Sequence, residues 1–336
     1  MNNINMEFAQ SVKDTLLSGQ SFDFESLALE VFRYQAKQNP IYKEYLSYLK
    51  KSPSSIRRIE EIPFLPIDFF KGHQILCKGC KPQVIFQSSG TTGTERSKHF
   101  VCDPYFYQEL SKKTFESFYG PIQDLHILAL LPNYLEKGDS SLVFMVDHFI
   151  KAAQAPSGFF LDEINKLILL LQELKNEGKK VLLIGVTFAL LDLAEHYSID
   201  LSGITIMETG GMKGRRKEML RSEVHQILQY SFNSNVIHSE YGMTELLSQA
   251  YSQEKEIFTG PNSLRILFRE INDPFSIEQQ KRNGGMNIVD LANIDSCSFI
   301  ETKDIGGKGV NQYDFKVLGR FDNSDVRGCN LLVQTT

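Results

Sequence analysis

Apolar runs that alternate with amphipathic segments constrain the fold of this chain more than any other feature. The apolar runs are short and strand-like, and the segments between them carry apolar residues at the three- and four-residue spacing of a helix. Such alternation predicts an α/β fold with a largely parallel sheet covered by helices. The predicted strands are residues 84–86, 127–131, 181–186, 204–207 and 235–239, and the predicted helices are 161–176 and 217–230.

The segments before and after this region have a different character. Residues 24–49 show helical spacing that breaks at Asn39-Pro40, because proline cannot continue a helix. After about residue 255, short β-like runs such as 313–318 are separated by Asn, Gly and Asp, which predicts antiparallel hairpins. We therefore predict a helical N-terminal segment packed on the main domain (1–80), an α/β core (81–255), and a β-rich subdomain with a C-terminal tail (256–336).

Composition excludes several classes of protein. The 336 residues include 36 basic and 41 acidic side chains, and a net charge of −5 argues against a chain-wide nucleic-acid surface. The N-terminus lacks the basic start and apolar core of a signal peptide. The longest apolar stretch, 181–194, is shorter than the roughly 20 residues that cross a bilayer. The 5 cysteines favour reduced thiols, so we expect a cytoplasmic protein without a membrane span.

A loop rich in serine, threonine and glycine follows the strand predicted at 84–86. Its glycines let backbone N–H groups face an anion, its hydroxyls add donors, and Arg96 and Lys98 add positive charge. The loop contains neither a Walker motif nor a dinucleotide-binding fingerprint. It suits a triphosphate, and the alternative is a solvated turn between a strand and a helix. The candidate binding residues here are Ser88, Ser89, Gly90, Thr91, Thr92, Gly93 and Lys98.

A second motif, Glu240-Tyr241-Gly242-Met243-Thr244-Glu245, directly follows a predicted strand. The Tyr241 ring, with Gly242 after it, suits a planar base, and the Thr244 hydroxyl can donate to a phosphate oxygen. Glu245 offers the oxygen ligand that Mg²⁺ prefers. The alternative is a strand-to-helix turn in which Glu245 favours a helix N-terminus.

Three further short segments contain candidate residues. Gly210 and Gly211 follow the strand predicted at 204–207. Asp304 can accept hydrogen bonds from both hydroxyls of a ribose, and Arg320 can donate to them. Taken singly, each of these short segments has an ordinary turn as its alternative.

Together, these motifs and their order along the chain resemble the adenylate-forming superfamily of acyl-CoA synthetases, which includes the phenylacetate-CoA ligases. The resemblance implies layered parallel sheets with helices, a late antiparallel β subdomain, and the use of ATP and Mg²⁺. It assigns the phosphates to Thr91 and Thr92, as catalytic residues together with Glu245. It assigns the borders of the adenine and acyl pockets to Gly210 and Gly211, the adenine stack to Tyr241, a phosphate contact to Thr244, Mg²⁺ to Glu245, and ribose to Asp304 and Arg320. Lys303 stands where the superfamily usually has glycine.

Segments 132–136, 140–142, 209–216 and 241–246 are similar to the acyl-protein synthetase (LuxE) family. That resemblance implies that a fatty acid is charged as acyl-AMP and then moved to a cysteine near the C-terminus. From there the acyl group passes to a partner acyl reductase. Cys329 is the matching cysteine, since a thiolate accepts acyl groups readily. Its alternative role is that of a small buried apolar side chain.

In full-length acyl-CoA synthetases, the segment matching 319–322 is a hinge that leads to a domain carrying a catalytic lysine. Here 14 residues follow Asp322, so we expect that the lysine domain is absent. This favours short synthetases of the LuxE type. Two alternatives stay open: a CoA ligase, and a non-catalytic subunit that binds an acyl group or a nucleotide within a reductase complex.

Cys77 and Cys80 have the spacing of a zinc knuckle. No second Cys/His pair lies near them in the sequence, and one pair is half of a structural zinc site. Sequence alone therefore favours ordinary thiols at these positions.

Overall fold

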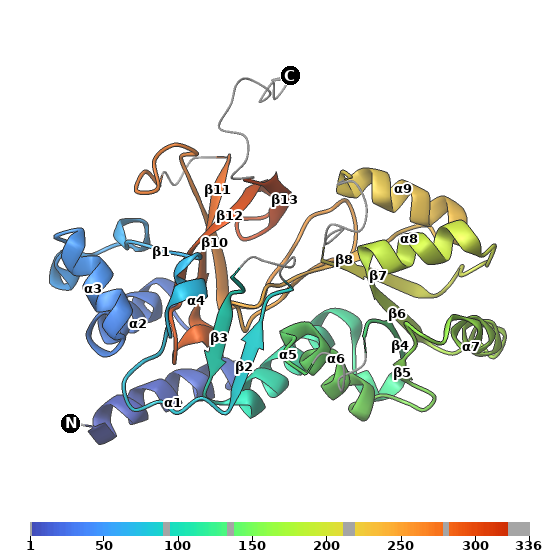
Figure 1. The fold of residues 1–336 in the computed structure, drawn as a ribbon, viewed down its shortest axis with the longest axis horizontal. Coiled ribbons are helices and arrows are strands. Elements are labelled where there is room, and N and C mark those ends of the chain that lie inside the picture. The colour runs from blue at the N-terminus through green and yellow to red at the C-terminus, as the bar shows by residue number, and fades with distance from the viewer. Residues whose placement is uncertain (1, 90–94, 133–137, 211–218, 278–281, 322–336) are drawn as a thin grey trace.

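The computed structural model describes residues 2–89, 95–132, 138–210, 219–277 and 282–321, and the structural statements below concern these parts of the chain. Two larger sheets and one hairpin, with helices packed around them, make up the architecture (Figure 1).

The predicted parallel sheet is present and has six strands in the order β5-β4-β6-β7-β8-β9. The first five run parallel, and β9 pairs antiparallel with β8. Every residue of β4 and β6 is buried. Because strands buried on both faces need apolar side chains in succession, these two strands appear in the sequence as nearly continuous apolar runs. The strands are β4 (His126–Leu130), β5 (Gly158–Phe159), β6 (Val181–Val186), β7 (Thr205–Thr209), β8 (His238–Tyr241) and β9 (Ala250–Ser252).

Helices cover this sheet on both faces. Figure 1 shows α8 and α9 on one face and α5 and α6 on the other. The face of α7 that packs inward is formed by Leu167, Leu171 and Leu174, at the spacing of successive helical turns. The helices are α5 (Pro104–Tyr119), α6 (Ser141–Ala152), α7 (Ile164–Asn176), α8 (Thr187–His196) and α9 (Arg221–Phe232).

The later part of the chain forms a second, five-stranded sheet. Its strands β10, β11, β12 and β13 pair antiparallel, as predicted for this region, and β1 joins β12 in parallel. A bulge lies between Ile305 and Gly306, where β12 pairs with β13. The strands are β1 (Leu65–Pro66), β10 (Leu264–Arg269), β11 (Asn283–Asp290), β12 (Phe299–Lys308) and β13 (Phe315–Arg320).

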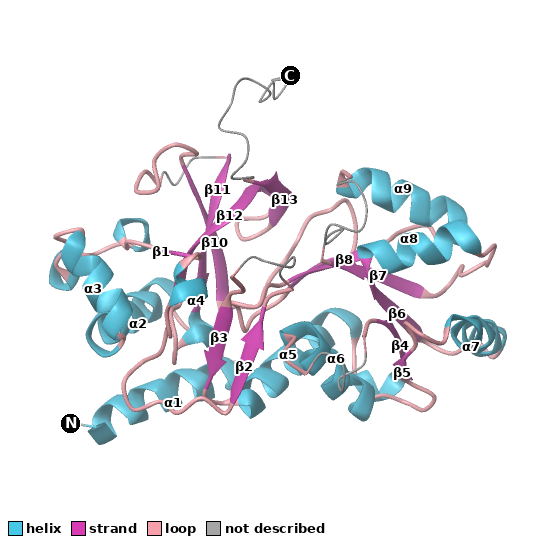
Figure 2. Ribbon diagram, in the orientation of Figure 1, coloured by secondary structure: helices cyan, strands magenta, loops and turns pink. Residues whose placement is uncertain are grey.

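The strand predicted at 84–86 does not belong to the parallel sheet, which corrects that part of the prediction. It is β2 (Val84–Gln87), and it pairs antiparallel with β3 (Lys98–Val101) in a sheet of two strands (Figure 2). A parallel pairing needs a long crossover connection. Here β3 is the next strand along the chain and pairs antiparallel with β2, so the serine- and glycine-rich segment connects the two strands of one hairpin.

The helical spacing predicted at 24–49 corresponds to two helices in the N-terminal segment, which also contains β1. The Asn39 side chain accepts a hydrogen bond from the backbone N–H of Tyr42 and caps the helix that begins at Pro40, so the predicted break is confirmed. This segment packs on the later sheet through an edge-on contact between the rings of Phe32 and Phe299, whose centroids are 5.9 Å apart. The elements are α1 (Asn2–Ser18), α2 (Phe24–Gln38), α3 (Pro40–Tyr48) and α4 (Phe69–Gly72). Short 3₁₀ turns are η1 (Pro53–Ser55), η2 (Ile59–Glu61), η3 (Ile122–Asp124) and η4 (Leu291–Asn293).

Within the described residues, none of the helices combines the length and the apolar character that crossing a membrane requires.

Candidate functional site

Tyr241 and Asp304 meet at the junction of the two larger sheets. Tyr241 is the last residue of β8, and its hydroxyl donates a hydrogen bond of 2.7 Å to Asp304 Oδ2 on β12, 63 residues further along the chain. The Arg320 guanidinium on β13 lies 3.7 Å from Asp304 Oδ1, because Asp304 and Arg320 are paired in the β12–β13 register. Two motifs that are distant in the sequence therefore form one polar cluster.

The strand β8 ends later than predicted. Its predicted range was 235–239, whereas the structure places it at His238–Tyr241. Tyr241 is thus a strand residue, and the turn begins at Gly242. The Tyr241 ring is buried and packs edge-on against Phe258 and Phe315, with centroid distances of 5.9 and 5.5 Å.

Asp304 is a nearly buried carboxyl group in this cluster. Burial raises its pKa, while the Tyr241 hydroxyl and the nearby guanidinium of Arg320 act in the opposite direction. Burial also raises the pKa of the Tyr241 hydroxyl, so it remains the donor in this hydrogen bond. Asp304 Oδ1 can accept a hydrogen bond from a polar ligand, and the exposed Arg320 side chain can donate one.

Glu245 lies near the same cluster and is also nearly buried. Burial raises its pKa, and a hydrogen bond from the Ser97 side chain together with the charge of Arg320 partly counteracts this. The Glu245 carbonyl accepts a hydrogen bond of 2.7 Å from Asn293 Nδ2, which holds the turn in place.

Glu245 is suited to be the ligand that the protein supplies to a magnesium ion. Proteins commonly bind Mg²⁺ through one or two carboxylates, and substrate phosphates and water supply the other ligands. Burial disfavours the ionised form of Glu245 and raises its pKa, and a cation beside the carboxylate would stabilise that ionised form.

The end of β7 lies beside the end of β8 and carries the predicted glycine motif. Thr209 and Glu240 are register partners, and the Thr209 hydroxyl donates to the Glu240 carboxylate. Gly210 has a φ of +76°, a conformation that favours glycine. Its carbonyl accepts a hydrogen bond of 2.8 Å from the Thr187 hydroxyl at the start of α8.

The serine-rich loop is anchored at both of its ends. The Ser88 backbone N–H donates to the Ser97 carbonyl, and the Ser97 N–H donates back to Ser88 Oγ, both at 3.0 Å. Ser89 is exposed, and so is Lys98 at the start of β3. Arg96 lies 3.8 Å from Asp139, which precedes α6. These contacts place the loop ends beside Ser97, the residue that contacts Glu245.

Several predicted residues lie outside the described residues. They are Gly90, Thr91, Thr92, Gly93, Gly211 and Cys329. Among the described candidates, Tyr241, Glu245, Asp304 and Arg320 come together, Thr244 and Gly242 lie in the turn between Tyr241 and Glu245, and Gly210 follows the neighbouring strand.

His99 was missed by sequence reasoning. It is buried on β3, with Nδ1 2.9 Å from the Thr244 carbonyl and Nε2 3.0 Å from Ser296 Oγ. Because the carbonyl can only accept, Nδ1 carries a proton. Burial lowers the pKa of His99 to about 4. His99 therefore ties the hairpin to the Tyr241–Glu245 turn, and no local pattern in the sequence marks it.

Glu208 and Arg221 were also missed. Glu208 is buried in β7, and its Oε1 lies 2.9 Å from Arg221 Nε, while its Oε2 accepts from the Thr187 hydroxyl. Burial alone would raise the Glu208 pKa, but His225, Arg221 and Ser239 lower it overall. The signal available in the sequence was a glutamate inside an apolar strand, since charged residues are rarely buried unless paired.

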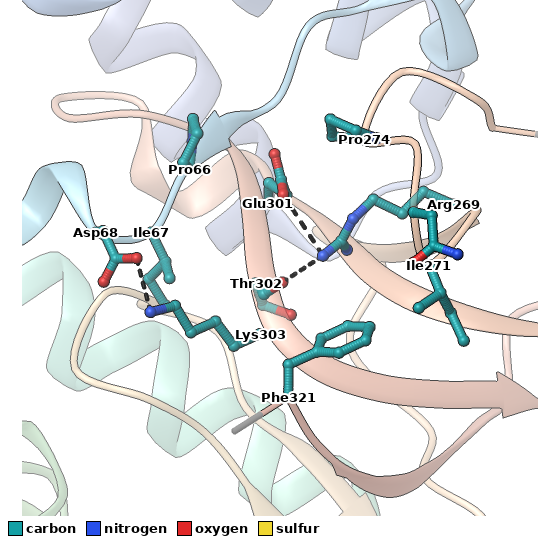
Figure 3. A pocket seen from close by; sticks show the side chains of 11 residues that line it. Pro66, Ile67, Asp68, Arg269, Ile271, Pro274, Glu301, Thr302, Lys303 and Phe321 are labelled. Atoms are coloured by element: carbon teal, nitrogen blue, oxygen red, sulfur yellow. Dashed lines mark hydrogen bonds and ion pairs between the residues drawn. The ribbon is translucent and has the colours of Figure 1, made fainter. Parts of the chain in front are cut away.

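Lys303, the departure from the superfamily pattern, faces away from the Tyr241–Asp304 pair. Its Nζ pairs with Asp68 Oδ2 at 2.7 Å beside a cavity of about 250 Å³ (Figure 3). Arg269 and Glu301 line the same cavity, with Arg269 Nη2 3.5 Å from Glu301 Oε1. Alternating residues of a strand point to opposite faces, so the lysine at this position leaves the Asp304 side of β12 unchanged.

Comparison with solved structures identifies proteins of similar architecture. A 2-hydroxyisobutyryl-CoA ligase, in the postadenylation state in complex with R3-HIB-AMP, has a TM-score of 0.61 over 92% of this chain and 67% of its own, at 12% identity. The fold is that of the adenylate-forming enzymes. An ATP-bound RpMatB–BxBclM chimera has a TM-score of 0.53 over 73% of this chain and 49% of its own, also at 12% identity.

Apo MatB from Rhodopseudomonas palustris has a TM-score of 0.50 over 70% of this chain and 47% of its own, at 12% identity. The chain thus spans about half the length of MatB and of the chimera, and about two thirds of the hydroxyisobutyryl-CoA ligase. No protein-family model matches the sequence, and no curated protein does. The fold confirms the layered α/β architecture expected from the superfamily resemblance.

Proposed function

We propose that this protein activates a carboxylic acid with ATP, forming an acyl-adenylate and pyrophosphate. The hydrogen bond between Tyr241 and Asp304, with Arg320 beside it, carries the proposal. It joins two motifs that the resemblance assigns to a single nucleotide, one to adenine and the other to ribose. Two solved structures of the same fold hold ATP and R3-HIB-AMP, and both molecules are consistent with such a ligand.

In the proposed reaction, the substrate carboxylate attacks the α-phosphorus of ATP in line with the bond to the β-phosphate. That bond breaks, and pyrophosphate leaves with the electron pair. Donors in the loop that contains Thr91 and Thr92 would hold the leaving phosphates, and the protein mainly positions the reactants. When bound at Glu245, Mg²⁺ would offset the charge that develops on pyrophosphate.

The proposed acyl acceptor is the Cys329 thiolate. Its sulfur attacks the carbonyl carbon of the acyl-adenylate, the thioester forms, and AMP leaves. An acyl reductase partner would then receive the acyl group, and a fatty acid is the expected substrate. CoA is the alternative acceptor, and it is favoured by the match of the fold to a CoA ligase over 92% of this chain.

Pyrophosphate release tests the first step. The purified chain would be assayed with ATP, Mg²⁺ and a panel of fatty, aromatic and amino acids, with and without CoA. Pyrophosphate release with at least one acid is expected. AMP release that depends on CoA would identify CoA as the acceptor, and ATP binding without pyrophosphate from any acid would contradict the proposed activity.

Replacement of Glu245 tests the magnesium assignment. Glu245→Ala, alone or together with Thr92→Ala, is expected to lower ATP–pyrophosphate exchange by at least about 100-fold, because the charge on the leaving group is no longer offset. Glu254→Ala removes an exposed glutamate and serves as the matched control, with unchanged exchange expected. Retained exchange in the Glu245 and Thr92 double variant would refute the assignment.

The acceptor is tested by labelling with radioactive fatty acid. Cys329→Ser is expected to keep ATP–pyrophosphate exchange and to lose stable acylation of the protein, because a serine forms no thioester. Cys297→Ala, which removes a buried thiol, serves as the control. Equal labelling of the Cys329→Ser variant and the unaltered protein would exclude Cys329 as the acceptor.

A further inference from the structure

Three side chains from three separate segments, none of them in the nucleotide motifs, lie close together. Cys80 lies in the connection between α4 and β2, Cys102 directly follows β3, and Asp295 lies in the turn after η4. One ligand atom from each lies within 4.8 Å of the other two. All three side chains are half-buried, so an ion from solvent can reach them. The fold thus adds two ligands to Cys80, which the sequence had paired only with Cys77.

Contacts around the group orient its ligand atoms. Cys80 Sγ donates to Asp295 Oδ1 at 3.4 Å. Asp295 Oδ2 lies 2.7 Å from Lys13 Nζ, which also contacts Asp103 at 3.2 Å. The Cys77 backbone N–H donates to the Asp295 carbonyl at 2.8 Å, which holds the turn containing Cys80 against the loop of Asp295. Asp295 is therefore fixed in place with one oxygen directed at a thiol.

The donor set selects the class of metal. Two sulfur atoms and one carboxylate oxygen suit Zn²⁺, which binds cysteine thiolates and carboxylates in tetrahedral sites. Ligand atoms on one tetrahedral zinc ion are about 3.3 to 3.8 Å apart, given typical zinc–sulfur and zinc–oxygen bond lengths. The present separations of at most 4.8 Å require only small side-chain movements to reach that geometry.

We propose that Cys80, Cys102 and Asp295 bind one Zn²⁺ ion, with a solvent molecule as the fourth ligand. Each thiol releases its proton to solvent as its sulfur bonds to the metal, and the two negative charges formed balance the charge of the ion. Asp295 Oδ1 exchanges the hydrogen bond from Cys80 for a bond to zinc. Its Oδ2 keeps Lys13, which acts as the outer partner that ligating carboxylates commonly have.

Cys77 stays outside the proposed ligand set. Its Sγ lies 3.6 and 3.7 Å from the carbonyl oxygens of Ile294 and Ser296, to which it donates. The site therefore differs from the zinc knuckle suggested by the Cys77–Cys80 spacing. Its metal would link the connection before β2, the end of β3 and the loop after η4, and binding to the folded state alone would stabilise the fold.

Metal content and cobalt spectroscopy test the proposal on the full chain, purified without a histidine tag and without a chelator. About one zinc per chain is expected in the unaltered protein, in Cys77→Ser, and in the buried-thiol control Cys297→Ala. After chelation, titration with Co²⁺ should produce the charge-transfer absorption of a cobalt–thiolate bond in these three proteins. Cys80→Ser and Cys102→Ser should lose zinc and weaken this absorption, and Asp295→Asn should bind Co²⁺ at least about tenfold more weakly.

Unfolding curves separate loss of metal from loss of fold. Zinc added to the chelated protein should raise the Tm of the unaltered chain and of Cys297→Ala, and should leave that of Cys102→Ser unchanged. If the Cys80 and Cys102 variants do not fold, the cobalt titration of the unaltered protein decides alone. Absence of the charge-transfer absorption in that titration would overturn the proposal. So would its loss in Cys77→Ser, or a Cys80–Cys102 disulfide in the freshly isolated protein. None of these readouts depends on ATP turnover.

Discussion

The hydroxyl of Tyr241 is the only atom of that side chain that can form a hydrogen bond, and it donates to a nearly buried carboxylate. In Tyr241→Phe, Asp304 loses a partner that lowers its pKa, so its ionised form becomes still less stable in the folded state. We expect the free energy of unfolding near neutral pH to fall by about 1 to 3 kcal/mol. The KM for ATP should rise about fivefold if Asp304 contacts the ribose, the equivalent of roughly 1 kcal/mol.

The sign of the pH dependence follows from the raised pKa of Asp304. The folded protein holds this proton more tightly than the unfolded chain, so stability falls as the pH rises above the ordinary value of 3.8. The deficit of Tyr241→Phe should therefore be small at about pH 4 and larger at about pH 7, as measured by urea unfolding. Tyr45→Phe removes a comparable hydrogen bond, to the Phe64 carbonyl, and serves as the control. An equal deficit at both pH values, or a raised KM in Tyr45→Phe, would contradict this assignment.

At the scale of elements, the β2–β3 hairpin is positioned by His99. The ring bonds the Thr244 carbonyl and Ser296 Oγ, and burial lowers its pKa to about 4 from an ordinary value of 6.5. The unfolded chain therefore takes up a proton before the folded protein does. The stabilising contribution is complete above about pH 6.5 and is lost as the pH falls towards about 4.

His99→Gln is expected to remove this part of the pH dependence. The unaltered protein should lose up to about 3 kcal/mol of stability between these two pH values on account of His99, and the variant should lose correspondingly less. Denaturant unfolding at a series of pH values measures the difference. His73→Gln changes an exposed histidine and should keep the profile of the unaltered protein. Parallel profiles for His99→Gln and the unaltered protein would show that His99 does not titrate in this way.

At the scale of the whole molecule, helix α2 is hydrogen-bonded to the connection between β11 and β12. Gln35 on α2 is buried, and its Nε2 lies 2.9 and 3.0 Å from the carbonyls of Asn293 and Ile294. Its Oε1 accepts from the Ser298 backbone N–H at 2.9 Å. More than 250 residues separate Gln35 from each of these partners in the chain. The first and last described parts of the chain thus share one buried hydrogen-bond network.

Gln35→Leu is expected to lower the free energy of unfolding by about 2 to 4 kcal/mol, because the side chain keeps its volume while buried backbone groups lose their partners. A single cooperative urea transition with an unchanged slope should accompany the loss. Gln10→Leu changes an exposed glutamine and should stay within about 0.5 kcal/mol of the unaltered protein. A separate early transition for the N-terminal helices would show that they fold independently of the later sheet.

How much of the fold could be predicted depended on whether the signal was local. The strand at 181–186 and the break at Asn39-Pro40 were predicted at their observed positions, because apolar periodicity and proline act within a few residues. The placement of β2 in the parallel sheet was wrong. A short apolar strand has the same sequence pattern in a hairpin as in a parallel sheet. Which of the two it forms depends on the strand with which it pairs.

The sequence by itself determined which residues carry polar chemistry, among them Tyr241, Glu245 and Asp304, and it determined the α/β alternation that holds them. Only the tertiary structure decided which of these side chains meet. The contact between Tyr241 and Asp304, the burial of His99, and the grouping of Cys80 with Cys102 and Asp295 all depend on register and packing between distant segments. Hydrophobic periodicity depends on residues that are close together in the sequence. These contacts join residues that are far apart in the sequence, and they form only when the long loops between them close and the segments pack around a common core.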